Sequence, residues 1–280
     1  MQIEEIITEL QEQGVVAPHM NTWRALSGGT VSSVYVLLVE GEPTLVVKMN
    51  DPKTIQSESS YLRTYEGNPL FSRVVYIDPL HRYFVYTYQP GDTQYPRNRK
   101  AEMLMTLATH VINQVKSVID SSDYGYADEP SASWKAFLML RYQWASETID
   151  TRLSSADHDL ALQLISRAPD HALQYLLHGD CGVHNFLFQH GEITGVIDPI
   201  PTIGEPLYDL IYAYCSSSDQ LDAETIQQAV RQMDPKYTIG RDLPSEVLIG
   251  LYYRIAICIL HHPQDFDAYI EAWEYWKRRK

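Results

Sequence analysis

The sequence predicts an α+β fold of two lobes, in which a small antiparallel sheet precedes a larger, mainly helical part. Three observations predict it. Strand-like segments dominate roughly the first third of the 280 residues, helical periodicity dominates the rest, and a QPGD turn at 89–92 separates the two regions. We therefore expect an N-terminal lobe over residues 1–88 and a C-terminal lobe over residues 89–280, with a cleft between them.

The N-terminal lobe is expected to form an antiparallel sheet with two helices. An amphipathic helix comes first, because Ile3, Ile7 and Leu10 fall on one helical face. Two apolar strands then flank a turn at Gly41, which predicts a hairpin. In chain order the expected elements are helix 3–13, strands 34–38 and 45–47, helix 54–66, and strands 73–77 and 82–88.

The C-terminal lobe is expected to be a set of helices that one short hairpin interrupts. The apolar runs FLF and ITGVID around a His-Gly turn predict this hairpin inside residues 176–200. The expected helices are 98–120, 131–153, 157–168, 205–217, 222–233, 244–261 and 264–279.

Charge and composition limit the classes of partner that the protein is expected to bind. Lys plus Arg number 22 and Asp plus Glu number 36, so the formal charge is −14 and neither nucleic acid nor an anionic membrane is the expected partner. A cationic small substrate is compatible with this charge, as is acidity that serves only solubility. The three cysteines form no CxxC pair, the N-terminus does not resemble a signal peptide, and no apolar run approaches about 20 residues. We expect a cytoplasmic protein.

The stretch HGDCGVHNFLF at 178–188, followed by ITGVIDPIP, has the residue types of a phosphoryl-transfer site. Asp180 lies in a tight turn, where its carboxylate could accept a hydrogen bond from an attacking hydroxyl. Asn185 follows five residues later, and Asp198 ends the next apolar run. Hard oxygen ligands of this kind suit magnesium, and pairing of the two apolar runs would bring Asn185 and Asp198 to the same end of the hairpin.

The N-terminal lobe offers residues for a nucleotide. Gly28 and Gly29 stand between two expected strands, where backbone N–H groups can approach phosphates, although hairpins also use such pairs. Lys48 follows three apolar residues on a strand that reads as buried on both faces, so it needs a partner. Glu58 in the following helix is the expected partner, and Glu66 is the alternative.

This order of motifs resembles that of the aminoglycoside phosphotransferase and choline kinase-like family, which shares the protein kinase-like fold. The resembling residues are the HGD triplet at 178–180, Asn185, and the Ile-Asp pair at 197–198. The resemblance implies that Asp180 is the catalytic residue and that Asn185 and Asp198 bind magnesium. It departs at Gly182 and His184, where many relatives carry His and Gly instead.

The same resemblance implies further roles along the chain. Lys48, held by Glu58, would contact the nucleotide phosphates, and the stretch YFVYTYQPGD at 83–92 resembles the hinge. There the backbone of Thr87 and Tyr88 would meet the adenine. His178 and Asp209 would be structural, the latter by packing on the catalytic loop.

The sequence therefore predicts ATP-dependent, magnesium-assisted phosphoryl transfer to a hydroxyl of a small molecule. Aminoglycosides, choline, sugars and amino alcohols all remain open as acceptors, because a fold does not fix its substrate. The alternative is a catalytically silent kinase-fold protein that binds a nucleotide or a partner. GTP in place of ATP, and the oligomeric state, also remain open.

Overall fold

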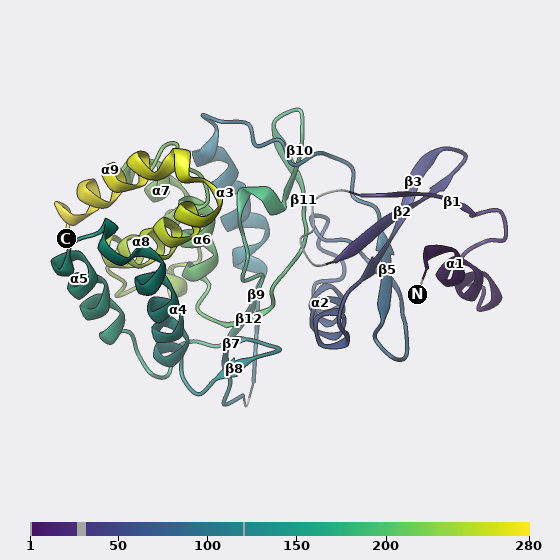
Figure 1. The fold of residues 1–280 in the computed structure, drawn as a ribbon, viewed down its shortest axis with the longest axis horizontal. Helices are drawn as coiled ribbons and strands as arrows, with labels where there is room; N and C mark the ends of the chain where they lie inside the picture. The colour runs from purple at the N-terminus through teal and green to yellow at the C-terminus, as the bar shows by residue number, and fades with distance from the viewer. Residues whose placement is uncertain (1, 27–31, 120) are drawn as a thin grey trace. The chain divides into compact units, whose positions relative to one another are not determined.

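The computed structural model describes residues 2–26, 32–119 and 121–280 (Figure 1). It divides into two compact units. One comprises the chain up to Gly91 together with Thr194–Ile197, and the other comprises Asp92–Ile193 and Asp198–Lys280. Each unit is described by itself below.

The N-terminal unit is built on a five-stranded antiparallel sheet in the order β1-β2-β3-β5-β4. Its hairpin β2–β3 is the one that the Gly41 turn predicts, with Val36 opposite Val46 and Val34 opposite Lys48. The strands are β1 (Thr22–Ala25), β2 (Ser33–Val39), β3 (Glu42–Met49), β4 (Val74–Ile77) and β5 (Tyr83–Thr87).

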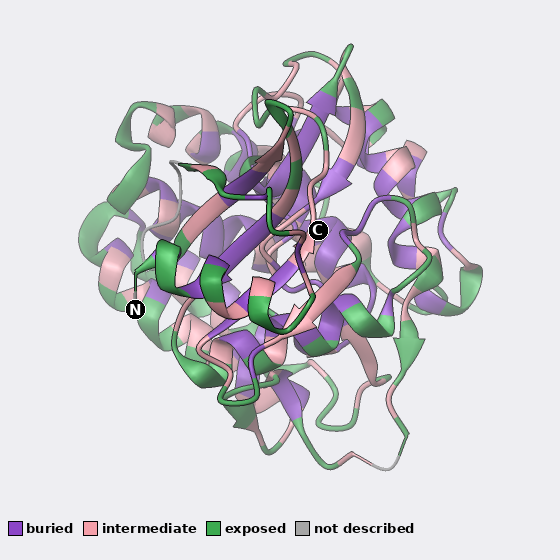
Figure 2. Cartoon of the chain, turned by 90° about the vertical axis from the view of Figure 1, so that its right-hand side faces the viewer, coloured by how far each residue is buried: buried purple, intermediate pink, exposed green. Residues whose placement is uncertain are grey.

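Helix α1 (Ile3–Glu12) covers one face of this sheet. Its apolar residues Ile6 and Leu10 are fully buried in a cluster that includes Leu37 and Val47 of the sheet. Buried residues follow the strands, whereas exposed residues collect in turns and on outer helix faces (Figure 2). Because side chains alternate along a strand, Lys48 points to the face opposite Val47.

Helix α2 (Pro52–Thr64) packs against β4 and β5. It begins where the sequence provides a cap: the Asp51 carboxylate accepts hydrogen bonds from the N–H groups of Lys53 and Thr54, and Pro52 occupies the first helical position. Ile55 and Glu58 are buried on this helix. Helix α2 therefore places a carboxylate within the unit's interior.

The C-terminal unit contains the predicted helices, several of them shorter than expected. The chain bends at Val111, so the helix expected over 98–120 ends at His110. The helices are α3 (Lys100–His110), α4 (Trp134–Ile149), α5 (Ser155–Ser166), α6 (Leu207–Cys215), α7 (Ala223–Val230), α8 (Leu243–His261) and α9 (Phe266–Lys277).

Helix α8 lies at the centre of this unit and packs against α4, α5, α6 and α9 (Figure 1). By length and composition alone it is apolar enough to cross a membrane, with a mean hydropathy of 1.6. Glu246 and Arg254 interrupt the consecutive apolar residues, so the sequence shows no continuous apolar run of this length. Of its apolar window 56% is buried inside the unit, and a core helix passes the same test.

A second small sheet in the C-terminal unit was missed by the sequence analysis. Its strand order is β6-β9-β12-β7-β8, and most of its members have only two or three residues. Strands this short show no alternation that a sequence pattern can detect. They are β6 (Lys116–Ser117), β7 (Tyr124–Tyr126), β8 (Pro130–Ser131), β9 (Tyr175–Leu177) and β12 (Thr202–Gly204).

The hairpin expected between the HGD triplet and the Ile-Asp pair is present. Strands β10 (Phe186–Gln189) and β11 (Glu192–Val196) form a two-stranded sheet. Strands β9 and β12, which flank this region in sequence, pair with each other, with Leu177 opposite Thr202. The chain therefore leaves the small sheet after Leu177 and returns to it at Thr202.

A buried carboxylate links α5 to α9. Asp157 forms the capping box of α5 with Ser154 and also accepts hydrogen bonds from Trp273 Nε1 at 2.8 Å and Lys277 Nζ at 2.7 Å. Burial alone would raise the pKa of Asp157, but the bonds from Lys277, Ser154 and Trp273 lower it to about 2. The ionised form is therefore favoured in the folded state.

We expect Asp157→Asn to destabilise the protein by about 1–3 kcal/mol, because charged hydrogen bonds are lost. The folded-state pKa of Asp157 lies below its ordinary value of 3.8, so its contribution is complete above about pH 4 and disappears as the pH falls toward 2. Urea unfolding at a series of pH values measures both effects. Asp159→Asn, an exposed carboxylate on the same helix, is the control, and an equal loss in both variants would contradict the assignment.

Candidate active site

The loop after β9 is held by one buried carboxylate of α6. Asp209, fully buried in the first turn of this helix, accepts hydrogen bonds from the backbone N–H of His178 at 2.9 Å and of Gly179 at 3.0 Å. Burial raises the pKa of Asp209 to about 6, while the two backbone bonds act in the opposite direction. The structural role that the resemblance implied for Asp209 matches these contacts.

Gly179 adopts a conformation that only glycine accepts readily. Its φ is +79°, and a Cβ there would lie 2.0 Å from the carbonyl oxygen of Ile200 and 2.3 Å from Thr202 Oγ1. The backbone N–H of Ile200 also donates to the His178 carbonyl at 2.9 Å. The two ends of the loop segment are therefore in direct backbone contact at this glycine.

Asp180 follows this glycine and presents an ionised carboxylate. Burial would raise its pKa, but hydrogen bonding and charge from His184, together with a hydrogen bond from Tyr212, lower it to about 2. The backbone N–H of Asp180 donates to His178 Nδ1 at 3.3 Å, so His178 steadies the loop. His184 Nε2 lies 3.5 Å from Asp180 Oδ2.

Asn185 joins the two acidic positions of the motif. Its Nδ2 donates to Asp180 Oδ2 at 2.8 Å and to the backbone oxygen of Asp198 at 3.5 Å. Asn185 ends the short 3₁₀ helix η3 (Val183–Asn185), while Asp198 stands just after β11 with a φ of +53°. The convergence that the hairpin predicted for Asn185 and Asp198 is confirmed, because one amide reaches both Asp180 and Asp198.

The loop carries oxygen donors of the kind that magnesium prefers. With Nδ2 of Asn185 turned to Asp180, its Oδ1 has no hydrogen-bond donor among the residues that the structure describes. Within the same described ranges no cluster of three or more His, Cys, Asp or Glu is arranged to hold a metal. One amide oxygen and one carboxylate fit magnesium, because this ion commonly takes few protein ligands and completes its shell with phosphates and water.

The N-terminal unit contains the predicted ion pair. Lys48 Nζ lies 2.8 Å from Glu58 Oε1 and 2.7 Å from Oε2, and both side chains are less than a tenth exposed. Glu66, the alternative partner, is exposed. Gly28 and Gly29, the residues predicted to contact the phosphates, lie outside the described residues.

The segment predicted to contact adenine is part of the sheet. The N–H of Thr87 donates to the Arg73 carbonyl at 2.9 Å, and the N–H of Tyr88 donates to the Thr44 carbonyl at 3.0 Å. Both donors are therefore already used inside the N-terminal unit. Contact of this segment with a nucleotide remains a prediction.

A pocket of about 530 Å³ opens beside Asp180 in the C-terminal unit. Its charged lining residues are Asp180, Glu129 and Arg141, and most of the remaining wall is apolar or aromatic. Arg141 is not among the site residues predicted from the sequence. A signal was present, since the buried positions Trp134, Phe137 and Ala145 of α4 place residue 141 on the same helical stripe, where a charge is unusual.

A two-unit fold with this carboxylate–amide loop defines a kinase-like phosphotransferase. Comparison with known proteins agrees. A family model described as "Phosphotransferase enzyme family" matches residues 22–242, and the chain belongs to that family. No curated protein matched the chain in sequence.

Solved structures with a similar fold include phosphotransferases with bound ligands. A thermostable mutant of aminoglycoside phosphotransferase APH(4)-Ia, in a complex with AMP-PNP and hygromycin B, is 18% identical with a TM-score of 0.63, over 99% of this chain and 97% of that one. A protein from Thermobifida fusca described as a "putative fructosamine-3-kinase" is 14% identical with a TM-score of 0.62, over 99% of this chain and 100% of that one. The GDP and kanamycin complex of APH(2″)-IIia is 15% identical with a TM-score of 0.60, over 99% of both chains. At these identities the likeness establishes the protein kinase-like fold.

We expect Gly179→Ala to reduce phosphotransferase activity about a hundredfold or more, because the loop that holds Asp180 must shift. Gly240→Ala is the matched control, since Gly240 has nearly the same φ of +75° but open space at its Cβ position. The control should lose only about 1–2 kcal/mol of stability from its left-handed backbone. Denaturant unfolding and turnover rates measure both variants, and equal effects would show that close approach at Gly179 is unimportant.

Proposed function

We propose that this protein transfers the γ-phosphoryl group of ATP to a hydroxyl of a small molecule, with magnesium as the required ion. The observation that carries the proposal is the Asn185 amide, which links the Asp180 carboxylate to the segment ending in Asp198. Phosphoryl transfer needs mainly positioning and charge stabilisation. In this proposal Asp180 would orient the acceptor, and Asn185 and Asp198 would hold the metal.

In the proposed step, Asp180 accepts the hydrogen bond of the acceptor hydroxyl. The hydroxyl oxygen forms a bond to the γ-phosphorus, its proton passes to Asp180, and the bond from the γ-phosphorus to the bridging oxygen of ADP breaks. The low pKa of Asp180 keeps it ionised at neutral pH, so it is ready to orient the hydroxyl. Tyr212 and His184 hold the carboxylate in place.

The magnesium ion would be held by Oδ1 of Asn185 and the carboxylate of Asp198, and when bound it would neutralise charge on the phosphates. Lys48, oriented by Glu58, would contact the nucleotide phosphates from the N-terminal lobe, residues 1–88. The C-terminal lobe, residues 89–280, would hold the acceptor in the pocket beside Asp180. Gly28 and Gly29, and the backbone of Thr87 and Tyr88, complete the proposed nucleotide contacts.

The ligands of structurally similar proteins support nucleotide binding but do not identify the nucleotide. AMP-PNP is bound by the similar APH(4)-Ia mutant, and GDP by APH(2″)-IIia. ATP is our choice for this chain, and GTP is the comparison to include in every assay. The net charge of −14 and the buried, free cysteines support a small-molecule acceptor and a reaction in the cytoplasm.

We expect Asp180→Asn to reduce magnesium-dependent ATP turnover on a panel of alcohols by about a thousandfold or more, because the group that orients the hydroxyl is lost. Coupled ADP release and mass spectrometry of the products measure it. Glu192→Gln, an exposed carboxylate on β11, is the control and should retain full rate. Magnesium–nucleotide binding by the wild type without any turnover would instead favour a silent binding protein.

The Lys48–Glu58 pair allows a test that separates stability from activity. We expect Lys48→Met to destabilise the protein by about 3–5 kcal/mol, because Glu58 is left buried without its cation. The double variant Lys48→Met with Glu58→Leu should recover most of that stability, since apolar pairs can replace buried ion pairs. Its kcat/KM for ATP should stay about a hundredfold or more below wild type. A double variant with normal kcat/KM would remove Lys48 from the nucleotide site.

A further inference from the structure

Arg141 of α4 is a largely enclosed cation without an acidic partner. It lines both the pocket beside Asp180 and a small neighbouring cavity of about 50 Å³. No carboxylate of the described residues lies within ion-pairing distance of it. An enclosed charge without a counterion is costly, so its presence at this position needs an explanation.

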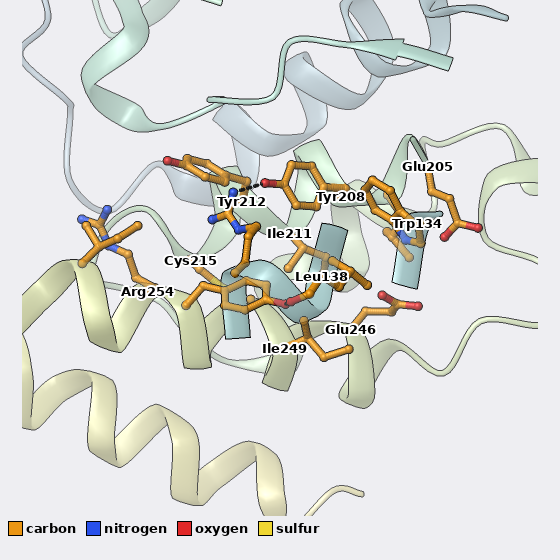
Figure 3. A pocket seen from close by; sticks show the side chains of 15 residues that line it. Trp134, Leu138, Glu205, Tyr208, Ile211, Tyr212, Cys215, Glu246, Ile249 and Arg254 are labelled. Carbon is orange, nitrogen blue, oxygen red and sulfur yellow. Dashed lines mark hydrogen bonds between the residues drawn. The ribbon is translucent and has the colours of Figure 1, made fainter. Parts of the chain in front are cut away.

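The protein satisfies only part of the Arg141 guanidinium. Its Nη1 donates to the hydroxyls of Tyr126 at 3.0 Å and Tyr208 at 2.5 Å, and the latter bond is drawn in Figure 3. Its Nε is buried without a hydrogen-bond partner. In the described part of the chain, Nη1 donates both of the hydrogen bonds that this side chain makes. Nη2 is the nitrogen left for a ligand, and a guanidinium N–H forms a strong charge-assisted hydrogen bond with a carboxylate or phosphate oxygen.

The aromatic rings around Arg141 hold it without neutralising it. The guanidinium carbon lies 4.9 Å from the ring centroid of Tyr253, 5.6 Å from that of Tyr208 and 5.8 Å from that of Phe137. Burial raises the pKa of Tyr208 and of Tyr253 far above neutrality, so both hydroxyls are uncharged. Cation–π contacts orient the positively charged guanidinium but do not neutralise its charge.

The nearby carboxylates are turned to other partners. Glu205 and Glu246 both pair with Arg241, and Figure 3 places them at the end of the small cavity opposite Tyr212 and Arg254. Glu129 of the larger pocket is exposed. Asp180 interacts with His184 and Tyr212. None of these groups compensates Arg141.

The wall between Arg141 and Asp180 is suited to an apolar body. Three of the large hydrophobic residues that remain exposed line this pocket, namely Leu140 (59% exposed), Trp144 (42%) and Ile200 (44%). Phe137 and Tyr212 contribute further aromatic surface. Exposed apolar side chains that gather around a pocket with few polar groups indicate a ligand site.

We infer that the phosphoryl acceptor is an anionic alcohol with an apolar or aromatic body, whose carboxylate or phosphate oxyanion binds Arg141 while its hydroxyl meets Asp180. The position of the hydroxyl rests on the proposed function, whereas the anion site rests on Arg141 alone. This substrate class is the opposite of the cationic acceptor that the acidic composition left open.

Binding can be tested without catalysis. The probes are 3-phenylpropionate, 3-phenylpropyl phosphate, methyl 3-phenylpropionate and 3-phenylpropylamine, which share one aromatic body and differ in head-group charge. Isothermal titration calorimetry on the full chain should give a Kd for at least one anion about tenfold or more below those of the ester and the amine. The two anions distinguish carboxylate from phosphate. Equal affinities, or a preference for the amine, would overturn the inference.

Variants assign the preference to one residue. Arg141→Gln should abolish the preference for the anion, and Arg141→Lys should retain part of it because the positive charge remains. Arg254→Gln is the matched control, since Arg254 is also buried and bonded to a tyrosine hydroxyl, at 3.0 Å from Tyr269, but does not line the pocket of Asp180. The Arg254→Gln variant should still prefer the anion. If Arg254→Gln loses this preference and Arg141→Gln keeps it, the inference is wrong.

Turnover separates this inference from the proposed function. With magnesium and ATP, 3-phenyllactate should be phosphorylated with a kcat/KM about tenfold or more above that of its methyl ester, and Arg141→Gln should remove the difference. Preferential binding of the anions without any ATP turnover would contradict the proposed function but support the anion site at Arg141. Turnover of neutral or cationic alcohols without a preference for anions would support the proposed function and contradict the anion site. Should Arg141→Gln fail to fold, the wild-type comparison and Arg141→Lys decide.

Discussion

The candidate site depends on the fully buried carboxylate of Asp209. A carboxylate in that position must find donors, and the N–H groups of His178 and Gly179 are the ones that reach it. This requirement fixes the start of the loop that carries Asp180 on the first turn of α6. Asp180 is the next residue, so its position follows from the hydrogen bonds that the buried Asp209 carboxylate requires.

A second constraint closes the loop at its other end. Gly179 lies against the backbone of Ile200, and Thr202 returns the chain to the small sheet beside β9. Asn185 and Asp198 lie within this closed segment, and the Asn185 amide spans the remaining gap. Short strands and a glycine therefore position the polar groups, while the long helices around α8 supply the core that supports them.

Lys48, Lys100 and Arg141, three of the cations with little solvent exposure, are stabilised in different ways. Lys48 is paired with the carboxylate of Glu58. Lys100 is fully buried at the carboxyl end of α6, where it donates to the carbonyls of Tyr214 and Ser217, as suits a helix C-terminus. Arg141 is surrounded by neutral rings and hydroxyls. The first two are satisfied within the protein, and the third is the one that a ligand would complete.

The sequence alone predicted the order of sheet and helices, the hairpin β2–β3, the choice of Glu58 over Glu66 as the partner of Lys48, and the convergence of Asn185 with Asp198. These follow from periodicity, turn residues and motif spacing, which are local signals. Only the tertiary structure revealed the small sheet of β9 and β12 and the isolation of Arg141. Both depend on contacts between residues far apart in the chain, because a strand of three residues or an absent counterion leaves no local pattern to detect.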